Sequence, residues 1–194
     1  AAIARINKGM DLVVIGGGLT VMQEVFVLKN SPFKNISDLR GKKFASWSTG
    51  AGAFKATRAA IIDGFVINVL KDTNFVQAAA PALFKLLGKG DDDSMFNISS
   101  LTIAAASEPD KYRSIFAPND YWKEKSGTPI VWSAPLIAWR SWVEEDRERA
   151  KNFVAATHES MKWLRKGENA DAAIKKYGKL AAVKNKAQAD TYKR

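Results

Sequence analysis

Short apolar runs alternate with stretches of helical spacing along most of this chain, and this alternation restricts its fold more than any other feature. Residues 11–15, 25–28 and 43–47 are short, largely apolar runs, each closed by turn-forming residues. The stretch that follows the third run spaces Phe54 and Ile61 at a helical period. Apolar runs that do not alternate with polar residues are typical of strands buried between helices. The pattern therefore predicts an α/β fold.

The same pattern predicts the course of individual segments. Gly16, Gly17 and Gly18 are expected to end the first strand. Residues 66–70 are expected to form a further strand, and residues 143–166 one long amphipathic helix.

Composition removes several classes of protein and of site. The chain has 194 residues and no cysteine, which excludes a disulfide scaffold, a thiolate zinc site and a cysteine nucleophile. His158 is the one histidine, so histidine-rich metal sites are excluded as well. No apolar stretch approaches about 18 residues, the length that a membrane-spanning helix needs.

Positive charge is concentrated at the C-terminal end of the sequence. The chain carries a net charge of +10, of which +7 falls on residues 162–194. Nucleic-acid-binding surfaces usually combine basic residues with a readable motif, and no such motif is present here. A solvated basic tail is the favoured interpretation, with contact to nucleic acid or membrane headgroups as the alternative. We expect no nucleic-acid partner.

Three consecutive motifs in the first 45 residues resemble a known family. Gly9-Met10-Asp11 precedes the first apolar run, Ser31-Pro32 closes the second, and Asp38-Leu39-Arg40-Gly41-Lys42 precedes the third. This order resembles the substrate-binding proteins of bacterial ABC importers for nitrate, sulfonates, taurine and thiamine precursors. The resemblance extends over roughly residues 5–165.

The resemblance implies a two-lobed, periplasmic-binding-protein-like (type II) α/β fold that closes on its ligand like a Venus flytrap. On the family pattern, residues 1–40 and 118–194 form lobe one and residues 41–117 form lobe two. Lobe one is expected to lack the strand–helix–strand with which family members begin. We expect a sheet rich in parallel pairs in each lobe, and chain crossings between the lobes near Phe44 and within residues 117–131.

Candidate ligand-binding residues follow from the segments at strand ends. Ser48, Thr49 and Gly50 lie between a strand and a helix, where free backbone amides and the helix dipole favour an anion. A plain helix cap is the alternative for this segment. The other candidates are polar, glycine or aromatic residues near strand ends, for which turn or core roles are the alternatives: Gly17, Gly18, Thr20, Trp47, Asn97 and Trp132.

Two other groups of residues suggest chemistry but do not support it. Asp91, Asp92 and Asp93 are adjacent carboxylates that would point in different directions in a loop, so a solvated loop is favoured over a cation site. His158 has no nucleophile motif beside it. We therefore expect no metal, no cofactor and no catalytic residue.

The function predicted from the resemblance is that of a solute receptor and not of an enzyme. It would capture a small anionic solute, such as a sulfonate, nitrate or a carboxylate, and deliver it to the permease of an ABC importer. It would act as a monomer in the periplasm, or outside the cell on a lipid anchor. The alternative is an enzyme on the same fold, such as a synthase of the pyrimidine precursor of thiamine.

Overall fold

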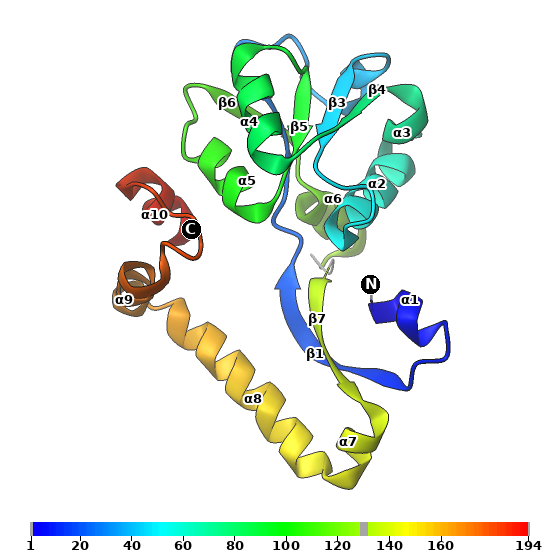
Figure 1. Ribbon diagram of the computed structural model, residues 1–194, viewed down its shortest axis with the longest axis vertical. Helices are drawn as coiled ribbons and strands as arrows, with labels where there is room; N and C mark the ends of the chain where they lie inside the picture. Colours follow the sequence, from blue (N-terminus) through cyan, green and yellow to red (C-terminus); the bar gives the residue numbers. More distant parts are fainter. Residues whose placement is uncertain (1, 129–131, 194) are drawn as a thin grey trace.

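A five-stranded mixed sheet with the strand order β4-β3-β5-β2-β6 organises the larger part of the chain in the computed structural model (Figure 1). The structure describes residues 2–128 and 132–193, without the side chains of residues 2, 3, 20, 132 and 133. Strand β3 runs parallel to both β4 and β5, whereas β2 runs antiparallel to both β5 and β6. The strands are β2 (Val25–Leu28), β3 (Lys43–Ser46), β4 (Asn74–Gln77), β5 (Ser94–Phe96) and β6 (Tyr112–Phe116).

Helices cover both faces of this sheet and create two apolar clusters. One cluster contains Phe44, Phe54 and Phe96, and the other contains Leu83, Leu87 and Met95. The α/β fold predicted from the sequence is confirmed. The helical elements are η1 (Ile36–Leu39), α2 (Gly52–Phe65), α3 (Val69–Asp72), α4 (Ala80–Lys89), α5 (Ser99–Ala106) and α6 (Pro118–Ser126).

One predicted strand in this part of the chain is wrong. The apolar run at 66–70 is a turn that leads into α3, because the Asn68 side chain accepts a hydrogen bond from the Leu70 amide and caps a helix there. The strand lies further along the chain, at β4, where apolar and polar residues do not alternate clearly. The helix cap at Asn68 therefore produces a helix where the apolar residues between Val66 and Leu70 predict a strand.

A long antiparallel ribbon of β1 (Leu12–Thr20) and β7 (Trp132–Trp139) forms the second structural unit (Figure 1). The prediction that Gly16, Gly17 and Gly18 end the first strand is wrong, because β1 continues through them with shifts in register. A Cβ atom on Gly18 would lie 2.1 Å from the Ala134 carbonyl oxygen, so glycine is what permits the two backbones to approach. Within the described residues, the ribbon is antiparallel, contrary to the parallel-rich sheet expected for lobe one.

The expected lobe boundaries need correction at both places. Residues 25–40 lie with the five-stranded sheet, because β2 pairs with β5 and β6 and because Ile36 and Leu39 are fully buried in its core. Helix α6, also expected in lobe one, packs on α2. We call residues 25–126 the sheet lobe, and residues 2–20 with 132–193 the ribbon part.

The two crossings between these units follow from the corrected boundaries. The first is residues 21–24, and not the neighbourhood of Phe44. The Asn119 side-chain amide in α6 holds it by donating to the Val21 carbonyl. The second runs from the end of α6 toward β7, in the expected range, and includes residues 129–131, which lie outside the described part.

In the described residues after the ribbon, four helices return toward the sheet lobe (Figure 1). The helix predicted at 143–166 is interrupted at Asp146, whose side chain accepts a hydrogen bond from the Arg149 amide and caps a new helix. The last helix packs on α5 of the sheet lobe. In the part of the chain that the structure describes, no helix has the length and apolar character needed to cross a membrane. The helices are α7 (Arg140–Glu145), α8 (Arg147–Leu164), α9 (Gly167–Tyr177) and α10 (Lys186–Lys193); a short α1 (Ala2–Ile6) precedes β1.

Candidate functional site

Three helices begin at the edge of the sheet where β3, β4 and β5 end. Ser46 is level with both Gln77 and Phe96 in the parallel register, so the three strands end together. The first crossing enters the sheet at this same edge, because Val25 pairs with Phe96. Ligands of open α/β sheets bind outside the carboxyl ends of parallel strands. We therefore take this edge, between the sheet lobe and the ribbon, as the candidate site.

The N-terminus of α2 is open at this edge. Its N-cap residue is Ala51, which makes no side-chain capping bond, and the first helical hydrogen bond runs from the Lys55 amide to the Ala51 carbonyl at 3.1 Å. The amides of residues 52–54 therefore precede the helical bonding pattern, and the helix dipole adds partial positive charge there. A group that accepts several hydrogen bonds and carries negative charge fits such a position.

The predicted residues Ser48, Thr49 and Gly50 form the turn before this helix. The Ser48 hydroxyl accepts a hydrogen bond from the Gly50 amide at 3.2 Å, which stabilises the turn. Thr49 is half-buried and Gly50 is exposed. A Cβ atom on Gly50 would meet only the Ser48 hydroxyl, at 3.7 Å, so the space above the turn is open. The turn is thus formed by Ser48, and the surface beside Gly50 is accessible.

Trp47 lies at the base of the same turn and is half-buried. Its ring stacks on Phe96 with the centroids 5.4 Å apart and an interplanar angle of 22°, and it packs against both apolar clusters. Core packing therefore holds the indole in a fixed orientation. Trp47 directly precedes the turn that leads into α2, and part of its surface is exposed.

Asn97 is placed at the site edge but turned into the protein. Its side chain is 1% exposed and donates to the Ala80 carbonyl at 2.9 Å, while its oxygen accepts from the Ile98 amide at 2.8 Å. It joins the end of β5 to the start of α4. The structure does not place Asn97 to contact a ligand as predicted, because its side chain is buried and its amide nitrogen also donates to the Met95 Sδ at 3.1 Å.

Gln23 is a further residue at the edge of the site. It lies in the first crossing, is 7% exposed, and donates from its side-chain nitrogen to the Ser99 hydroxyl at 2.9 Å. Its side-chain oxygen is buried and has no partner among the described residues. The available signal was a pair of polar residues, Gln23 and Glu24, within an otherwise apolar connection. Gln23 ties the crossing to the first turn of α5.

Glu24 adds a partly buried carboxyl to the same crossing. Burial raises the pKa of Glu24 above its ordinary value, and the nearby Asp120 charge acts in the same direction. A hydrogen bond with Ser114 opposes them. The crossing therefore holds a carboxyl whose ionised form is disfavoured by its surroundings.

The remaining predicted residues lie on the ribbon and not in a loop. The Gly17 carbonyl oxygen is 3.3 Å from the His158 Nε2, and Gly18 lies against the backbone of β7. Thr20 pairs with Trp132 through the backbone at the end of the ribbon that adjoins the crossings. The side chains of Thr20 and Trp132 lie outside the described residues. The structure thus gathers Trp47, Ser48, Thr49 and Gly50 at one edge and places the ribbon candidates across the crossings.

The three adjacent aspartates do not form a metal site. Among the described residues, no group of three or more potential ligands converges. Asp93 accepts a hydrogen bond from the Lys43 amide at 2.8 Å, whereas Asp92 is 5% exposed and its Oδ2 has no described partner. Burial raises the pKa of Asp92, and the Lys43 charge opposes this shift.

The raised pKa of Asp92 predicts a pH-dependent loss of stability. Because the folded-state pKa exceeds the unfolded value, stability falls as the pH rises through the folded pKa, and the whole penalty is present above it. Asp92→Asn is expected to raise the free energy of unfolding by about 1 kcal/mol at pH 8, with a smaller gain at pH 3, below the ordinary pKa of an aspartate of about 3.9. Urea denaturation measures both values. Asp91→Asn, at an exposed position, should change neither. A variant Asp92→Asn no more stable than the parent at pH 8 would contradict this account.

Comparison with known proteins identifies related sequences and folds. The sequence profile of the family described as NMT1/THI5 like matches residues 1–170. No curated protein matches the chain.

Solved structures of other proteins share the fold. A protein of Bordetella bronchiseptica covers 98% of this chain at a TM-score of 0.69 and 20% identity. The periplasmic aliphatic sulphonate binding protein SsuA of Escherichia coli covers 98% at a TM-score of 0.63 and 18% identity. The alkanesulfonate-binding protein SsuA of Xanthomonas axonopodis, bound to MOPS, covers 95% at 0.63 and 14% identity. In turn, the matches cover 59%, 58% and 60% of those three chains, so this chain spans about three fifths of their length.

Proposed function

Because the chain belongs to the NMT1/THI5-like family, we propose that it acts as the solute-binding receptor of an ABC importer and that its solute is a small sulfonate. The observation that carries this proposal is the open N-terminus of α2, which follows the turn that begins after the half-buried Trp47. The names of two solved relatives, both sulfonate-binding proteins, agree with this solute class.

A sulfonate fits the chemistry of this edge. Its three oxygens share one negative charge and accept several hydrogen bonds, which the amides of residues 52–54 and the Thr49 hydroxyl can donate. Its alkyl group is apolar and can lie against the half-buried Trp47. Nitrate has the same charge but no apolar group. Carboxylates have the same charge on a planar group with two oxygens and not on a tetrahedral group with three.

Two units joined by short crossings allow a closing movement around the solute. In this proposal the sheet lobe binds the anion, and the end of the ribbon with Gly17, Gly18, Thr20 and Trp132 closes over it. A ligand shifts the balance of open and closed forms only through its extra affinity for the closed form, and a shift from 1:99 to 99:1 requires about 5.5 kcal/mol. One aromatic contact and a few hydrogen bonds made on closure are of that order.

The receptor role also implies a partner and a compartment. We propose that the closed, loaded protein is recognised by the permease of its importer on the outer side of the cytoplasmic membrane. The alternative role, an enzyme on the same fold, would convert its bound molecule. The histidine, which is the usual proton-transferring residue at neutral pH, lies on α8 beside the ribbon and not at the edge that holds the α2 N-terminus.

Calorimetric titration with methanesulfonate tests the proposal. Thr49→Ala is expected to weaken methanesulfonate binding about 10- to 150-fold, because one charge-assisted hydrogen bond contributes about 1.5–3 kcal/mol. Thr191→Ala, on the distant α10, serves as the matched control and should bind like the parent. Mass spectrometry of the incubated ligand should recover it unchanged. Absence of methanesulfonate binding rejects the solute class, and conversion of the ligand favours the enzyme.

A further inference from the structure

The C-terminal helices present a surface on which exposed apolar side chains lie among lysines. The four large apolar side chains are Leu180, 87% exposed, together with Tyr177, Trp163 and Leu164, which are about half exposed. Trp163, Leu164 and Tyr177 line an apolar hollow of about 630 Å³ between the end of α8, α9 and the loop that follows it. We call these residues, with the loop at 178–185, the C-terminal surface.

The loop that carries Leu180 is held in place by hydrogen bonds. The Val183 amide donates to the Gly178 carbonyl at 2.8 Å, and the Leu180 amide to the Tyr177 carbonyl at 2.9 Å. The Tyr192 hydroxyl of α10 donates to the Ala181 carbonyl at 2.9 Å. Leu180 is therefore kept in solvent by a bonded turn, at the cost of hydrating an apolar side chain. Such an arrangement suits a side chain that contacts something outside the chain.

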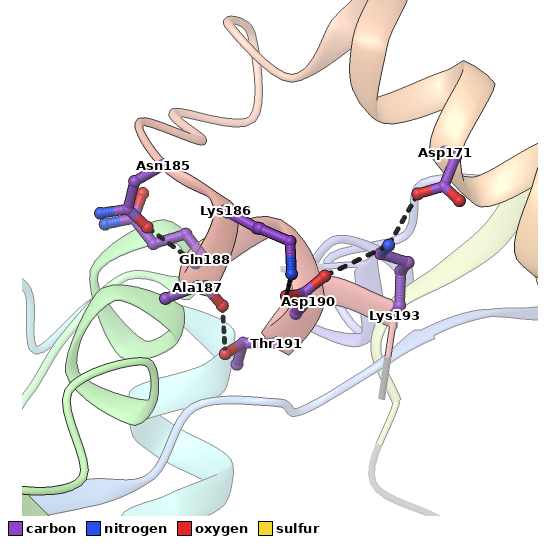
Figure 2. A network of polar contacts seen from close by, with 8 residues as sticks. All are labelled: Asp171, Asn185, Lys186, Ala187, Gln188, Asp190, Thr191 and Lys193. Atoms are coloured by element: carbon purple, nitrogen blue, oxygen red, sulfur yellow. Dashed lines mark hydrogen bonds and ion pairs between the residues drawn. The ribbon is translucent and has the colours of Figure 1, made fainter.

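Much of the positive charge here faces outward. Figure 2 shows that Lys193 pairs with both Asp171 and Asp190, and that Lys186 pairs with Asp190, which joins α9 to α10. These pairs use all but one of the acidic residues at 162–194. Among the described residues, the other basic side chains here make no ion pair; Lys175, Lys176, Lys179 and Lys184 are exposed around Leu180 in the sequence. The surface thus combines exposed apolar groups with exposed lysines that make no ion pair among the described residues.

We propose that the C-terminal surface binds the headgroup region of an anionic lipid bilayer, with Leu180 entering the interface. Lysines attract anionic headgroups, tryptophan and tyrosine favour the interfacial region, and a leucine gains by leaving water. Charge complementarity selects an anionic bilayer over a neutral one. Nucleic acid would satisfy the lysines but would leave the exposure of Leu180 unexplained.

Vesicle flotation of the 194-residue chain tests this proposal. Binding to vesicles of phosphatidylcholine with about one third phosphatidylglycerol is expected to exceed binding to pure phosphatidylcholine at least tenfold and to fall with added salt. The double variant Lys179→Glu with Lys184→Glu should lose at least about 25-fold in affinity, since each lysine near such a surface contributes about fivefold. Leu180→Ser should lose about tenfold. Circular dichroism should show that each variant keeps its fold.

Matched substitutions on the sheet lobe supply the controls. Val66 is 79% exposed and Lys71 and Lys89 are exposed, so Val66→Ser and the pair Lys71→Glu with Lys89→Glu reproduce the same chemical changes elsewhere. They should leave vesicle binding within about twofold of the parent. The proposal would be overturned if the substitutions on the sheet lobe weakened vesicle binding as much as those on the C-terminal surface. Equal binding to anionic and neutral vesicles would overturn it as well. Duplex DNA binding unaffected by Leu180→Ser would assign the surface to nucleic acid instead. A dimer in light scattering that Leu180→Ser abolishes would assign it to self-association.

Discussion

Phe96→Ala is expected to lower the free energy of unfolding by about 3–5 kcal/mol, the range for removing a fully buried phenylalanine side chain. Phe96 is 0% exposed and is the last residue of β5, where its ring stacks on Trp47 and meets the edge of Phe54. Its removal leaves a cavity under the candidate site. Urea denaturation followed by circular dichroism measures the change.

An exposed phenylalanine provides the control for Phe96→Ala. Phe153 is 51% exposed on α8, so Phe153→Ala is expected to cost about 1 kcal/mol or less. Since Trp47 loses its stacking partner in Phe96→Ala, tryptophan fluorescence in the folded state should also change. A loss of stability below about 1.5 kcal/mol for Phe96→Ala would mean that Phe96 does not anchor this part of the core.

Gly50→Asp is expected to weaken methanesulfonate binding by about 100-fold or more without affecting the fold. The position has room for a side chain, since a Cβ atom would meet only the Ser48 hydroxyl at 3.7 Å. A carboxylate there would lie near the anion bound at α2. Two like charges about 5 Å apart repel by about 3 kcal/mol at an effective dielectric constant of about 20. Calorimetry measures the loss.

Gly50→Asn separates this charge effect from a steric one. Asparagine has nearly the same shape as aspartate but no charge, so its affinity for methanesulfonate should stay within about fivefold of the parent. Both variants should unfold at the same urea concentration as the parent to within the error of measurement. If aspartate and asparagine weaken binding equally, the anion does not bind at this helix terminus.

The edge of the sheet lobe has two layers: a buried layer that supports the fold, and an exposed layer at which the solute is proposed to bind. Phe96 and Asn97 are buried and hold the strand end and the start of α4 in place. The turn at residues 48–50 lies above them, with Gly50 exposed to solvent. A change in the supporting layer should therefore appear first as lost stability. A change in the binding layer should appear as lost affinity alone.

Local sequence features were enough to predict the α/β class and most of the elements. Val25 to Leu28 and Lys43 to Ser46 form strands where short apolar runs occur, and α2 forms where Phe54 and Ile61 keep a helical spacing. The turn at Ser48 to Gly50 was predicted for the same reason, since a strand followed by glycine and a helix can be recognised within about ten residues. These features depend on neighbours in the chain, so the sequence displays them directly.

Long-range pairing decided the remaining features of this protein. No residue close to Gly18 in the sequence indicates that the Ala134 carbonyl will approach it. The sequence therefore predicts a strand end at Gly16 to Gly18, whereas in the structure these glycines belong to a continuous strand of the ribbon. The bond from Asn97 to Ala80 spans 17 positions, and the bond from Gln23 to Ser99 spans 76. The residues next to Asn97 and Gln23 in the sequence therefore do not indicate these partners. The observed lobe boundary differs from the expected one because β2 pairs with the distant strands β5 and β6 and so belongs to the sheet lobe. Hydrogen bonding between distant segments has no local signature, and only the tertiary structure determines it.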